Sequence, residues 1–389
     1  MPRLVAIAMP GGPSFVEAVI STWDRGDAVA PLDPRAPAAH RDDVLGILAP
    51  EALIGADGNE VPLDGGRPVE DGDALVITTS GTSGVPRAVV LTHDAVRAAA
   101  FTTATRVGLD PGTRWLACLP LHHIGGFGVV SRALVTKSEL EVHPGFDPDA
   151  VDDAARRGAT HVSLVPTSLS RVDTQRFRTI LLGGSAIPED RPPNSIATYG
   201  MTETCGGVVY DGLALNGVGL RVDDTARIWL SGPTLLRAYR DGHDPKDDNG
   251  WLRTSDLGSV DPTTGSLTVW GRADDMIVTG GEKVWPATVE AVLGEGHDVR
   301  DVAVVGRSDP EWGERVVALV VPFDDRPPPS LDDLRARVKD RLPAYFAPKE
   351  LEMVDSIPRT ALGKVGRAAL RQAEQQRAEA QHGTAMRGR

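Results

Sequence analysis

Short apolar runs alternate with amphipathic segments along the first half of the chain. The sequence predicts strands at 4–8 and 28–31 and helices at 14–23 and 36–48. Four further apolar runs, bounded by glycine, proline or polar residues, are typical of buried strands: 74–77, 115–119, 160–165 and 179–182. Such alternation predicts right-handed βαβ units and a largely parallel sheet, and therefore an α/β fold. Ligands are then expected at the carboxyl ends of the strands.

The loop after the apolar run 74–77 carries many donors for an anion. Its residues are Thr79, Ser80, Gly81, Thr82, Ser83, Gly84, Val85, Pro86 and Arg87. The glycines let backbone N–H groups turn toward a phosphate, the hydroxyls add donors, and Arg87 adds a fixed positive charge. The loop is not a Walker A motif, because no Gly-Lys pair stands at its end. It either binds a polyphosphate or is a linker rich in Ser, Thr and Gly.

Length and charge narrow the classes of function. With 389 residues, the chain exceeds what one hydrophobic core usually holds, so we expect two domains. The net charge of -13 argues against a nucleic-acid partner. Cys118 and Cys205 lack the spacing of a disulfide framework or a zinc site, which favours a reduced, cytoplasmic setting. No apolar run approaches the ~18 residues of a spanning helix, so no integral membrane segment is expected.

Five further segments stand in order along the rest of the chain. They are 181–186, 198–204, 250–258, 271–277 and 358–365. With the loop at 79–87, this ordered series resembles the signature motifs of the adenylate-forming superfamily of acyl-CoA synthetases, luciferases and peptide-synthetase adenylation domains. The resemblance covers residues 13–370. The short length and residues 119–126 and 198–211 are similar to the short o-succinylbenzoate-CoA ligases of menaquinone synthesis.

The resemblance implies a large N-terminal domain with mixed and parallel sheets and a small, mobile C-terminal α/β domain. We expect the adenylation core at 1–273 and the C-terminal domain at 274–378, with a hinge at Asp274. A fixed linker at Asp274 is the alternative. Residues 379–389 are expected to form a disordered tail. Compared with full-length family members, the large domain is expected to be N-terminally shortened, ahead of the phosphate loop.

The resemblance also implies residues that bind ATP, Mg²⁺ and coenzyme A. The nucleotide-binding set is Thr79, Ser80, Gly81, Thr82, Ser83, Gly84, Arg87, Gly183, Gly184, Ser185, Tyr199, Gly200, Met201, Thr202, Asp256 and Arg272. Glu203, together with Thr82, would hold Mg²⁺, which prefers oxygen ligands. Lys364 would bridge the substrate carboxylate and the α-phosphate during adenylation. Gly280 and Gly281 would line the pantetheine tunnel during thioester formation.

Several of these residues also have a purely structural interpretation. Glu203 and Lys364 could be exposed surface charges. Tyr199 could be a buried strand aromatic with a satisfied hydroxyl, and Asp256 could cap the end of a strand. Arg272 could pair with an aspartate that follows it at 274 or 275, a surface ion pair of little energetic value.

The acyl pocket is expected around two adjacent histidines. His123 matches the family's gate histidine, whereas His122 replaces a common aromatic residue. A metal bound by this pair is the alternative, although no cysteine or carboxylate stands at ligand spacing nearby. The other residues assigned to the substrate are Gly125, Gly126, Ser163, Thr167 and Arg132. The glycines would allow close approach to a flat ring, and the last three could bind a second carboxylate. For Arg132 alone we favour the structural interpretation, in which it extends from a helix to solvent.

Together these roles predict an ATP-dependent acid:CoA ligase that forms an acyl-adenylate and then a thioester. The expected acid is o-succinylbenzoate, and the expected partners are this acid, ATP and CoA. One alternative is an aryl or acyl acid ligase that loads CoA or a carrier protein. Another is a non-catalytic nucleotide-binding scaffold that has kept the fold. A homodimer is a further expectation.

Overall fold

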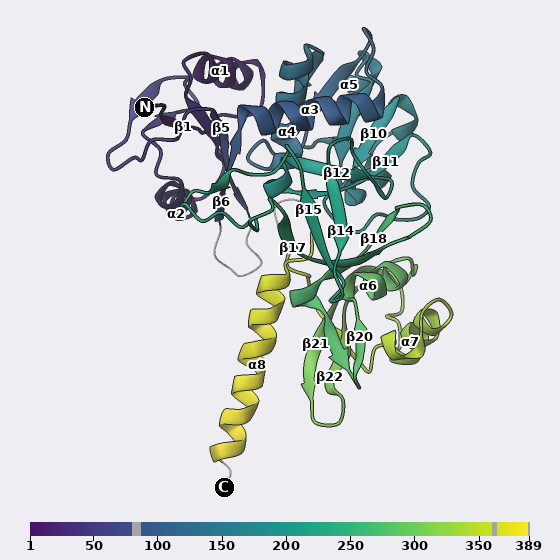
Figure 1. Cartoon of the computed structure of the whole chain (residues 1–389). Coiled ribbons are helices and arrows are strands. Elements are labelled where there is room, and N and C mark those ends of the chain that lie inside the picture. Colours follow the sequence, from purple (N-terminus) through teal and green to yellow (C-terminus); the bar gives the residue numbers. More distant parts are fainter. Residues whose placement is uncertain (80–86, 360–363, 388–389) are drawn as a thin grey trace. The chain divides into compact units, whose positions relative to one another are not determined.

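The computed structural model describes residues 1–79, 87–359 and 364–387 (Figure 1). Five residues assigned to the nucleotide lie outside the described residues: Ser80, Gly81, Thr82, Ser83 and Gly84. The chain divides into two units. Unit 1 comprises Met1–Arg221, Trp229–Arg253 and Val260–Leu267, and unit 2 comprises Val222–Ile228, Thr254–Ser259 and Thr268–Arg389. The domain boundary and hinge at Asp274 stay predictions, as does the disordered tail at 379–389.

A seven-stranded sheet in unit 1 contains the two strands that flank the predicted phosphate loop. Its order is β16-β6-β5-β2-β1-β3-β4. The strands are β1 (Leu4–Ile7), β2 (Ala28–Pro31), β3 (Ala52–Ile54), β4 (Glu60–Pro62), β5 (Asp73–Thr79), β6 (Arg87–Thr92) and β16 (Ala238–Tyr239). The pairings among β1, β2, β3 and β5 are parallel, and those of β4, β6 and β16 are antiparallel. Helices α1 (Pro13–Asp24) and α2 (Ala38–Leu48) follow the first two strands, as predicted.

A second seven-stranded sheet in unit 1 has the order β13-β12-β11-β10-β9-β7-β8. Its strands are β7 (Arg114–Ala117), β8 (Glu139–Val142), β9 (His161–Leu164), β10 (Thr179–Leu182), β11 (Ser195–Met201), β12 (Gly206–Tyr210) and β13 (Leu213–Ala214). The first five of these run parallel to one another. The short helices η1 (Pro166–Arg171), η2 (Thr174–Arg176) and η3 (Thr202–Thr204) lie between strands. The predicted α/β fold with mixed and parallel sheets is confirmed.

Helices α3 (His93–Val107), α4 (Ile124–Thr136) and α5 (Pro148–Arg156) belong to the same unit. Local signals fix their ends: the Thr92 hydroxyl accepts a hydrogen bond of 3.1 Å from the Ala95 amide at the start of α3. α3 ends at Gly108, which has a positive φ of 72°. α3 and α4 pack side by side (Figure 1). The apolar side of α4 is buried, with Phe127 and Val130 at 0% exposure, and this packing sets the direction of its polar side chains.

A four-stranded sheet has the order β14-β15-β17-β18. Its strands are β14 (Gly219–Val222), β15 (Arg227–Ser231), β17 (Leu252–Val260) and β18 (Leu267–Arg272). Unit 2 holds a sheet of order β20-β19-β22-β21, in which β23 pairs with β22. Its elements are η4 (Ala273–Asp275), β19 (Ile277–Thr279), β20 (Glu282–Val284), α6 (Pro286–Gly294), β21 (Val299–Asp309), β22 (Gly313–Pro322), α7 (Leu331–Lys339), η5 (Ala344–Phe346), β23 (Glu350–Met353) and α8 (Arg367–Arg387). Val304, Val316 and Leu334, at 0% exposure, lie in its core. A compact α/β piece after Asp274 is therefore present, as predicted.

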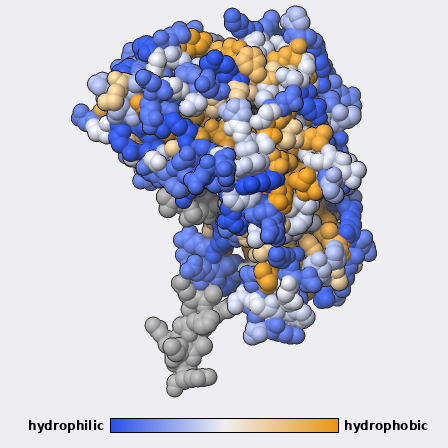
Figure 2. Space-filling view, viewed as in Figure 1, coloured by the Kyte–Doolittle hydropathy of each residue, from blue (hydrophilic) through white to orange (hydrophobic). Residues whose placement is uncertain are grey.

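The surface drawn in Figure 2 is largely hydrophilic, with hydrophobic residues in small groups. Among the residues described, none of the helices has the length and apolar character needed to cross a membrane.

Candidate active site

The predicted phosphate loop joins two strands of unit 1 that pair with each other. The antiparallel register of β5 and β6 places Thr79 opposite Arg87. The Thr79 hydroxyl donates to the Arg87 carbonyl oxygen over 3.4 Å. The loop therefore closes a β-hairpin and does not lead from a strand into a helix. The Arg87 side chain is exposed at its base, where it can meet an anion.

A tyrosine that the sequence analysis did not identify contacts both Arg87 and Glu203. The guanidinium carbon of Arg87 lies 5.0 Å from the centroid of the Tyr239 ring. The Tyr239 hydroxyl donates a hydrogen bond of 3.0 Å to Oε1 of Glu203. Burial, reinforced by the Glu203 carboxylate, raises the pKa of Tyr239 to about 12, so the hydroxyl keeps its proton at neutral pH. Two predicted site residues are thus linked by a third that no motif indicated.

A tight turn holds Glu203 in place. β11 ends with Gly200 and Met201, and Glu203 lies in the short helix η3 that follows directly. The Thr204 hydroxyl accepts from the Met201 amide over 2.9 Å and donates to the Gly206 carbonyl oxygen over 2.6 Å. The Leu236 amide donates to the Glu203 carbonyl oxygen over 2.8 Å. The half-buried carboxylate of Glu203 is therefore attached to a fixed backbone.

The Glu203 carboxylate fits a magnesium ion. Mg²⁺ takes oxygen ligands and is usually bound by one or two carboxylates together with substrate phosphates and water. Within the described part of the chain, no group of three or more His, Cys, Asp or Glu side chains could hold a metal ion. A dedicated metal cage, including one built on the histidine pair, therefore has no support among these residues. A magnesium site that Glu203 shares with nucleotide phosphates stays a prediction.

Glycines at the end of β10 allow close contact with the neighbouring strand β11. A Cβ on Gly183 would lie 2.4 Å from the Thr198 hydroxyl oxygen, so this position requires glycine. Gly184 has a positive φ of 90°, and Ser185 after it is exposed. Tyr199 follows Thr198 on β11 and is half-buried. Unit 1 thus brings Gly183, Gly184 and Tyr199 to adjacent strands, as a base-binding role needs.

The two histidines of the expected acyl pocket precede helix α4. His123 is the residue before the first helical turn, and the centroids of the His122 and His123 rings lie 4.3 Å apart. Burial lowers the pKa of His122, which favours the neutral imidazole. A Cβ on Gly126 would lie 2.3 Å from the Pro120 carbonyl oxygen, so this glycine is needed for the turn into α4. Gly125 is exposed one residue earlier.

Arg132 lies on α4 over the indole ring of Trp115. Its guanidinium carbon is 4.6 Å from the ring centroid. Its Nε and Nη1 atoms are buried, and neither has a hydrogen-bond partner among the residues that the structure describes. Burial lowers the pKa of Arg132. The preferred interpretation from sequence, in which Arg132 extends to solvent, is wrong, because packing of α4 directs the side chain inward onto Trp115.

The neighbours of Trp115 complete this buried polar region. The parallel register of β7 and β9 places Trp115 opposite His161, and their ring centroids lie 4.9 Å apart. Loss of hydration lowers the pKa of His161 to about 4. Ser163, two residues further along β9, is also buried, whereas Thr167 in η1 is exposed. Three residues are expected to bind a second carboxylate. The Ser163 side chain and the Arg132 guanidinium are buried, and only Thr167 is exposed.

Three predicted residues interact within unit 2. Arg272 Nη1 lies 3.8 Å from Asp256 Oδ1. Lys364 is exposed by its surface area, yet the surrounding protein removes enough hydration to lower the pKa of its ammonium. The Asp256 carboxylate raises this pKa and the Arg272 guanidinium lowers it. The Thr254 hydroxyl accepts from the Asp256 amide over 3.1 Å and fixes that turn of β17. The side chain of Lys364 therefore lies in the electrostatic field of the two residues predicted to bind ribose.

The Gly280-Gly281 pair forms the turn between β19 and β20. The φ values are 60° and 83°, which favour glycine. The Gly280 amide donates to the Trp312 carbonyl oxygen over 2.8 Å, and a Cβ on Gly280 would lie 2.7 Å from the Trp312 ring. Lys349 Nζ lies 3.1 Å from the centroid of the same ring. The turn is thus in close contact with an aromatic side chain that is 41% exposed.

Comparison with known proteins identifies the family. The model for AMP-binding enzyme matches residues 59–239, and the model for AMP-binding enzyme C-terminal domain matches residues 288–364. A "probable 2-succinylbenzoate–CoA ligase" of Mycobacterium tuberculosis is 42% identical over 344 residues, which cover 82% of this chain and 88% of that protein. The chain belongs to the AMP-binding enzyme family, the adenylate-forming superfamily.

Other members of the AMP-binding enzyme family are also similar. An indoleacetate–CoA ligase of Aromatoleum aromaticum is 34% identical over 372 residues, covering 84% of this chain and 72% of that protein. The o-succinylbenzoate CoA synthetase of Bacillus subtilis, solved with the acyl-adenylate intermediate OSB-AMP, has a TM-score of 0.83 at 26% identity. That match covers 95% of this chain and 88% of the solved one. The same synthetase solved with ATP and a magnesium ion has a TM-score of 0.82 at 26% identity. That match covers 94% of this chain and 88% of the solved one. The predicted fold and family are confirmed.

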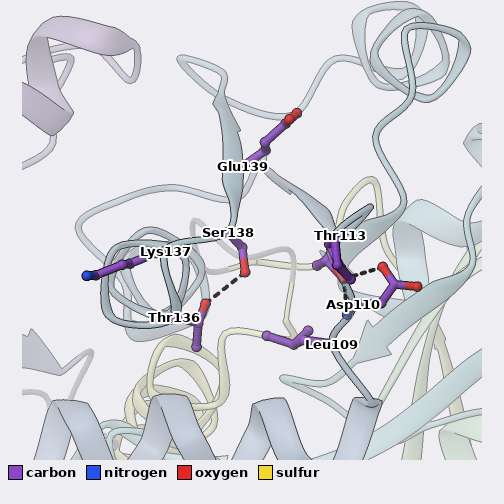
Figure 3. Close-up of a pocket in the computed structure, with 8 residues that line it drawn as sticks. Leu109, Asp110, Thr113, Thr136, Lys137, Ser138 and Glu139 are labelled. Carbon is purple, nitrogen blue, oxygen red and sulfur yellow. Dashed lines mark hydrogen bonds between the residues drawn. The ribbon is translucent and has the colours of Figure 1, made fainter.

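A pocket of this AMP-binding enzyme lies at the C-terminal end of α4 (Figure 3), where the Thr136 hydroxyl donates to the Arg132 carbonyl oxygen over 2.8 Å. It is lined by residues of the segment before β7 and of the connection from α4 to β8, including Asp110, Thr113, Thr136 and Ser138. The Thr136 and Ser138 hydroxyls bond to each other over 2.9 Å, and the Thr113 hydroxyl bonds to Asp110 Oδ1 over 3.2 Å. These polar groups satisfy one another, so we assign no ligand to this pocket.

Proposed function

We propose that this AMP-binding enzyme is an ATP-dependent acid–CoA ligase that converts 2-succinylbenzoate to its CoA thioester. The relative in M. tuberculosis carries the name of this activity, and the synthetase of B. subtilis was solved with OSB-AMP. Within the chain itself, the observation that carries the choice of acid is the buried guanidinium of Arg132.

The environment of Arg132 favours an acid with two carboxylates. A buried charge is costly unless it is paired and hydrogen-bonded. The described residues supply a π-face to Arg132 but no acceptor for its Nε–H and Nη1–H groups. A carboxylate can accept two such bonds at once from a guanidinium. In a dicarboxylic acid, one carboxylate can react while the other pairs with Arg132, and Ser163 can add a hydroxyl.

Adenylation joins two anions, so the residues near the phosphates must supply positive charge. A carboxylate oxygen of the acid attacks the α-phosphorus of ATP, the bond to pyrophosphate breaks, and no proton is transferred. Arg87 would bind phosphate oxygens, and Lys364 would bridge the attacking carboxylate and the α-phosphate. Magnesium bound to Glu203 would offset the charge of the phosphates. Asp256 and Arg272 would bind the ribose, and Tyr199 would stack on the adenine with Gly183 and Gly184 at its edge.

Thioester formation uses coenzyme A as the acceptor. The CoA thiolate attacks the acyl carbon of the adenylate, the mixed-anhydride C–O bond breaks, AMP leaves, and the thiol proton passes to solvent. The turn of Gly280 and Gly281 would line the path of the pantetheine arm. A rotation about Asp274 would exchange this turn for Lys364 between the two half-reactions. The cytoplasmic location and a homodimer stay predictions.

An arylacetate ligase is the second candidate, because the indoleacetate–CoA ligase is also similar to this chain. In a monocarboxylic acid the single carboxylate is the group that reacts, so no second anion would pair with Arg132. A non-catalytic scaffold would have no use for the charged set of Arg87, Glu203, Lys364 and Arg132. These features favour the dicarboxylate ligase over both alternatives.

The test is product analysis with a panel of acids. Pyrophosphate release and thioester mass are measured with Mg-ATP for 2-succinylbenzoate, indoleacetate, benzoate and octanoate, each with and without CoA. The proposal expects a CoA thioester chiefly from 2-succinylbenzoate. A thioester from indoleacetate alone would assign the second candidate, and absence of adenylate with every acid would contradict an acid ligase of either kind.

A further inference from the structure

We infer that Tyr239 is a positioning residue that orients the Glu203 carboxylate for Mg²⁺ and places Arg87 for the nucleotide phosphates. This inference rests on the proposed roles of Glu203 and Arg87. The observations behind it are the hydrogen bond of 3.0 Å from the Tyr239 hydroxyl to Glu203 Oε1 and the 5.0 Å separation of the Arg87 guanidinium from the Tyr239 ring centroid. One side chain thus contacts two groups of opposite charge.

The chain around Tyr239 is fixed at several points. Tyr239 lies on β16, which pairs with β6 and places Tyr239 opposite Val89. Val89 follows Arg87 by two residues on β6. The Arg237 guanidinium donates two bonds to the fully buried Asp73 carboxylate, over 2.8 and 2.9 Å. The ammonium of Lys246 donates to the Leu236 and Arg237 carbonyl oxygens over 2.8 and 2.9 Å. The Tyr239 side chain is 8% exposed. This backbone can therefore hold the hydroxyl at one position relative to Glu203.

A neutral donor suits a carboxylate that has to bind a cation. A lysine or arginine bonded to Glu203 would offset its negative charge and compete with Mg²⁺. The Tyr239 hydroxyl fixes Oε1 by a hydrogen bond and leaves the full charge on the carboxylate, whose second oxygen can face the ion. The electron-rich face of the same ring attracts the Arg87 guanidinium. Arg87 thus lies over the Tyr239 ring and also reaches its hydroxyl, which donates to Glu203, so one tyrosine holds both charged groups where they can act on the same magnesium nucleotide.

Calorimetric titration of the full-length enzyme with ATP tests the inference, with Mg²⁺ or with EDTA and without any acid. The gain in ATP affinity on adding Mg²⁺ is compared for wild type, Tyr239→Phe, Glu203→Gln and the double variant. We expect Tyr239→Phe to lose about tenfold of this gain, as for a hydrogen bond to a charged group, with ATP binding in EDTA little changed. The double variant should lose no more of the Mg²⁺-dependent gain in ATP affinity than Glu203→Gln loses alone.

Tyr210→Phe is the matched control. The Tyr210 hydroxyl bonds to the Thr103 hydroxyl over 3.1 Å, and its side chain is 1% exposed. This variant also loses a buried hydroxyl, so we expect a lower melting temperature and an unchanged gain from Mg²⁺. Thermal melts verify the fold of every variant. If the Phe variant does not fold, Tyr239→Met repeats the titration; it lacks both the hydroxyl and the ring, so it should lose the same Mg²⁺ gain and also bind ATP more weakly in EDTA.

The outcomes separate this inference from the proposed function. The role of Tyr239 would be overturned, and that of Glu203 kept, if Tyr239→Phe retained the full gain in ATP affinity from Mg²⁺. The same holds if the double variant lost the product of the two single-variant losses. A wild-type enzyme without any gain from Mg²⁺ would overturn the role of Glu203 and this inference with it. A wrong choice of acid leaves the titration unaffected, because no acid is present.

Discussion

The guanidinium carbon of Arg132 lies 4.6 Å from the centroid of the Trp115 ring, and that ring lies 4.9 Å from the His161 imidazole. The three side chains come from α4, β7 and β9. A cation–π contact holds a guanidinium without consuming its N–H groups. Arg132 therefore stays available to an anion, which is the basis for the proposed dicarboxylate substrate.

The buried imidazole of His161 predicts a loss of stability in acid. Its pKa falls to about 4 in the folded protein, mainly through loss of hydration, from 6.5 in the unfolded chain. The unfolded chain therefore binds a proton first as the pH falls. This contribution to the free energy of unfolding is complete above pH 6.5 and decreases by about 3 kcal/mol between pH 6.5 and 4.

Urea unfolding at pH 7 and pH 4.5 measures this effect in wild type and His161→Gln. Wild type should lose more free energy of unfolding between the two pH values than the variant does. His297→Gln, at an exposed position, is the control and should behave like wild type. Equal losses in wild type and His161→Gln would show that His161 does not titrate as described.

Lys364 predicts the alkaline limit of adenylation. The proposed role needs a protonated ammonium, and loss of hydration lowers the pKa of Lys364 from 10.5. The rate of ATP–pyrophosphate exchange with the acid should therefore fall at a pH below 10.5. In Lys364→Arg, whose guanidinium stays charged, the rate should be lower but this fall should disappear. Lys339→Arg, at an exposed lysine of α7, is the control; an alkaline fall that persists unchanged in Lys364→Arg would contradict the assignment.

Gly280→Ala should slow thioester formation more than adenylation. A methyl group at a φ of 60° is strained and would lie 2.7 Å from the Trp312 ring, which has to move. Displacement of this turn should reduce the rate of transfer from adenylate to CoA on the order of tenfold. Gly313→Ala has the same type of strain, at a φ of 77°, but its nearest contact is 3.6 Å away. Single-turnover rates for both half-reactions decide the matter, and equal effects of the two substitutions would refute a role for the Gly280 turn.

Much of the fold could be predicted from sequence because its signals are local. The apolar runs that became β1, β2, β5 and β10 are bounded by polar or turn residues, and α1 and α2 follow the first two strands. The family motifs also indicated Asp256, Arg272 and Lys364. No local pattern, however, indicates that these residues interact with one another in unit 2. These three residues are far apart in sequence, and only the tertiary structure brings them together.

The side-chain environments could not be predicted in the same way. Tyr239 is 36 residues from Glu203 and lies in a strand of two residues, which leaves no periodic pattern. For Arg132 the sequence favours a position in solvent, because most helical arginines extend there. Its actual direction depends on the packing of α4 beside Trp115, a contact between distant segments. Residues whose role depends on such packing are the ones that sequence patterns miss.

The most direct test of the dicarboxylate claim compares 2-succinylbenzoate with 4-oxo-4-phenylbutanoate, the same acid without its ring carboxylate. The ratio of kcat/KM for the two acids is measured in wild type, Arg132→Leu and Arg132→Lys. We predict that wild type prefers 2-succinylbenzoate by about a hundredfold, as for a buried charge-assisted pair, that Arg132→Lys keeps part of this preference, and that Arg132→Leu abolishes it. An Arg132→Leu enzyme with the wild-type preference would contradict the account.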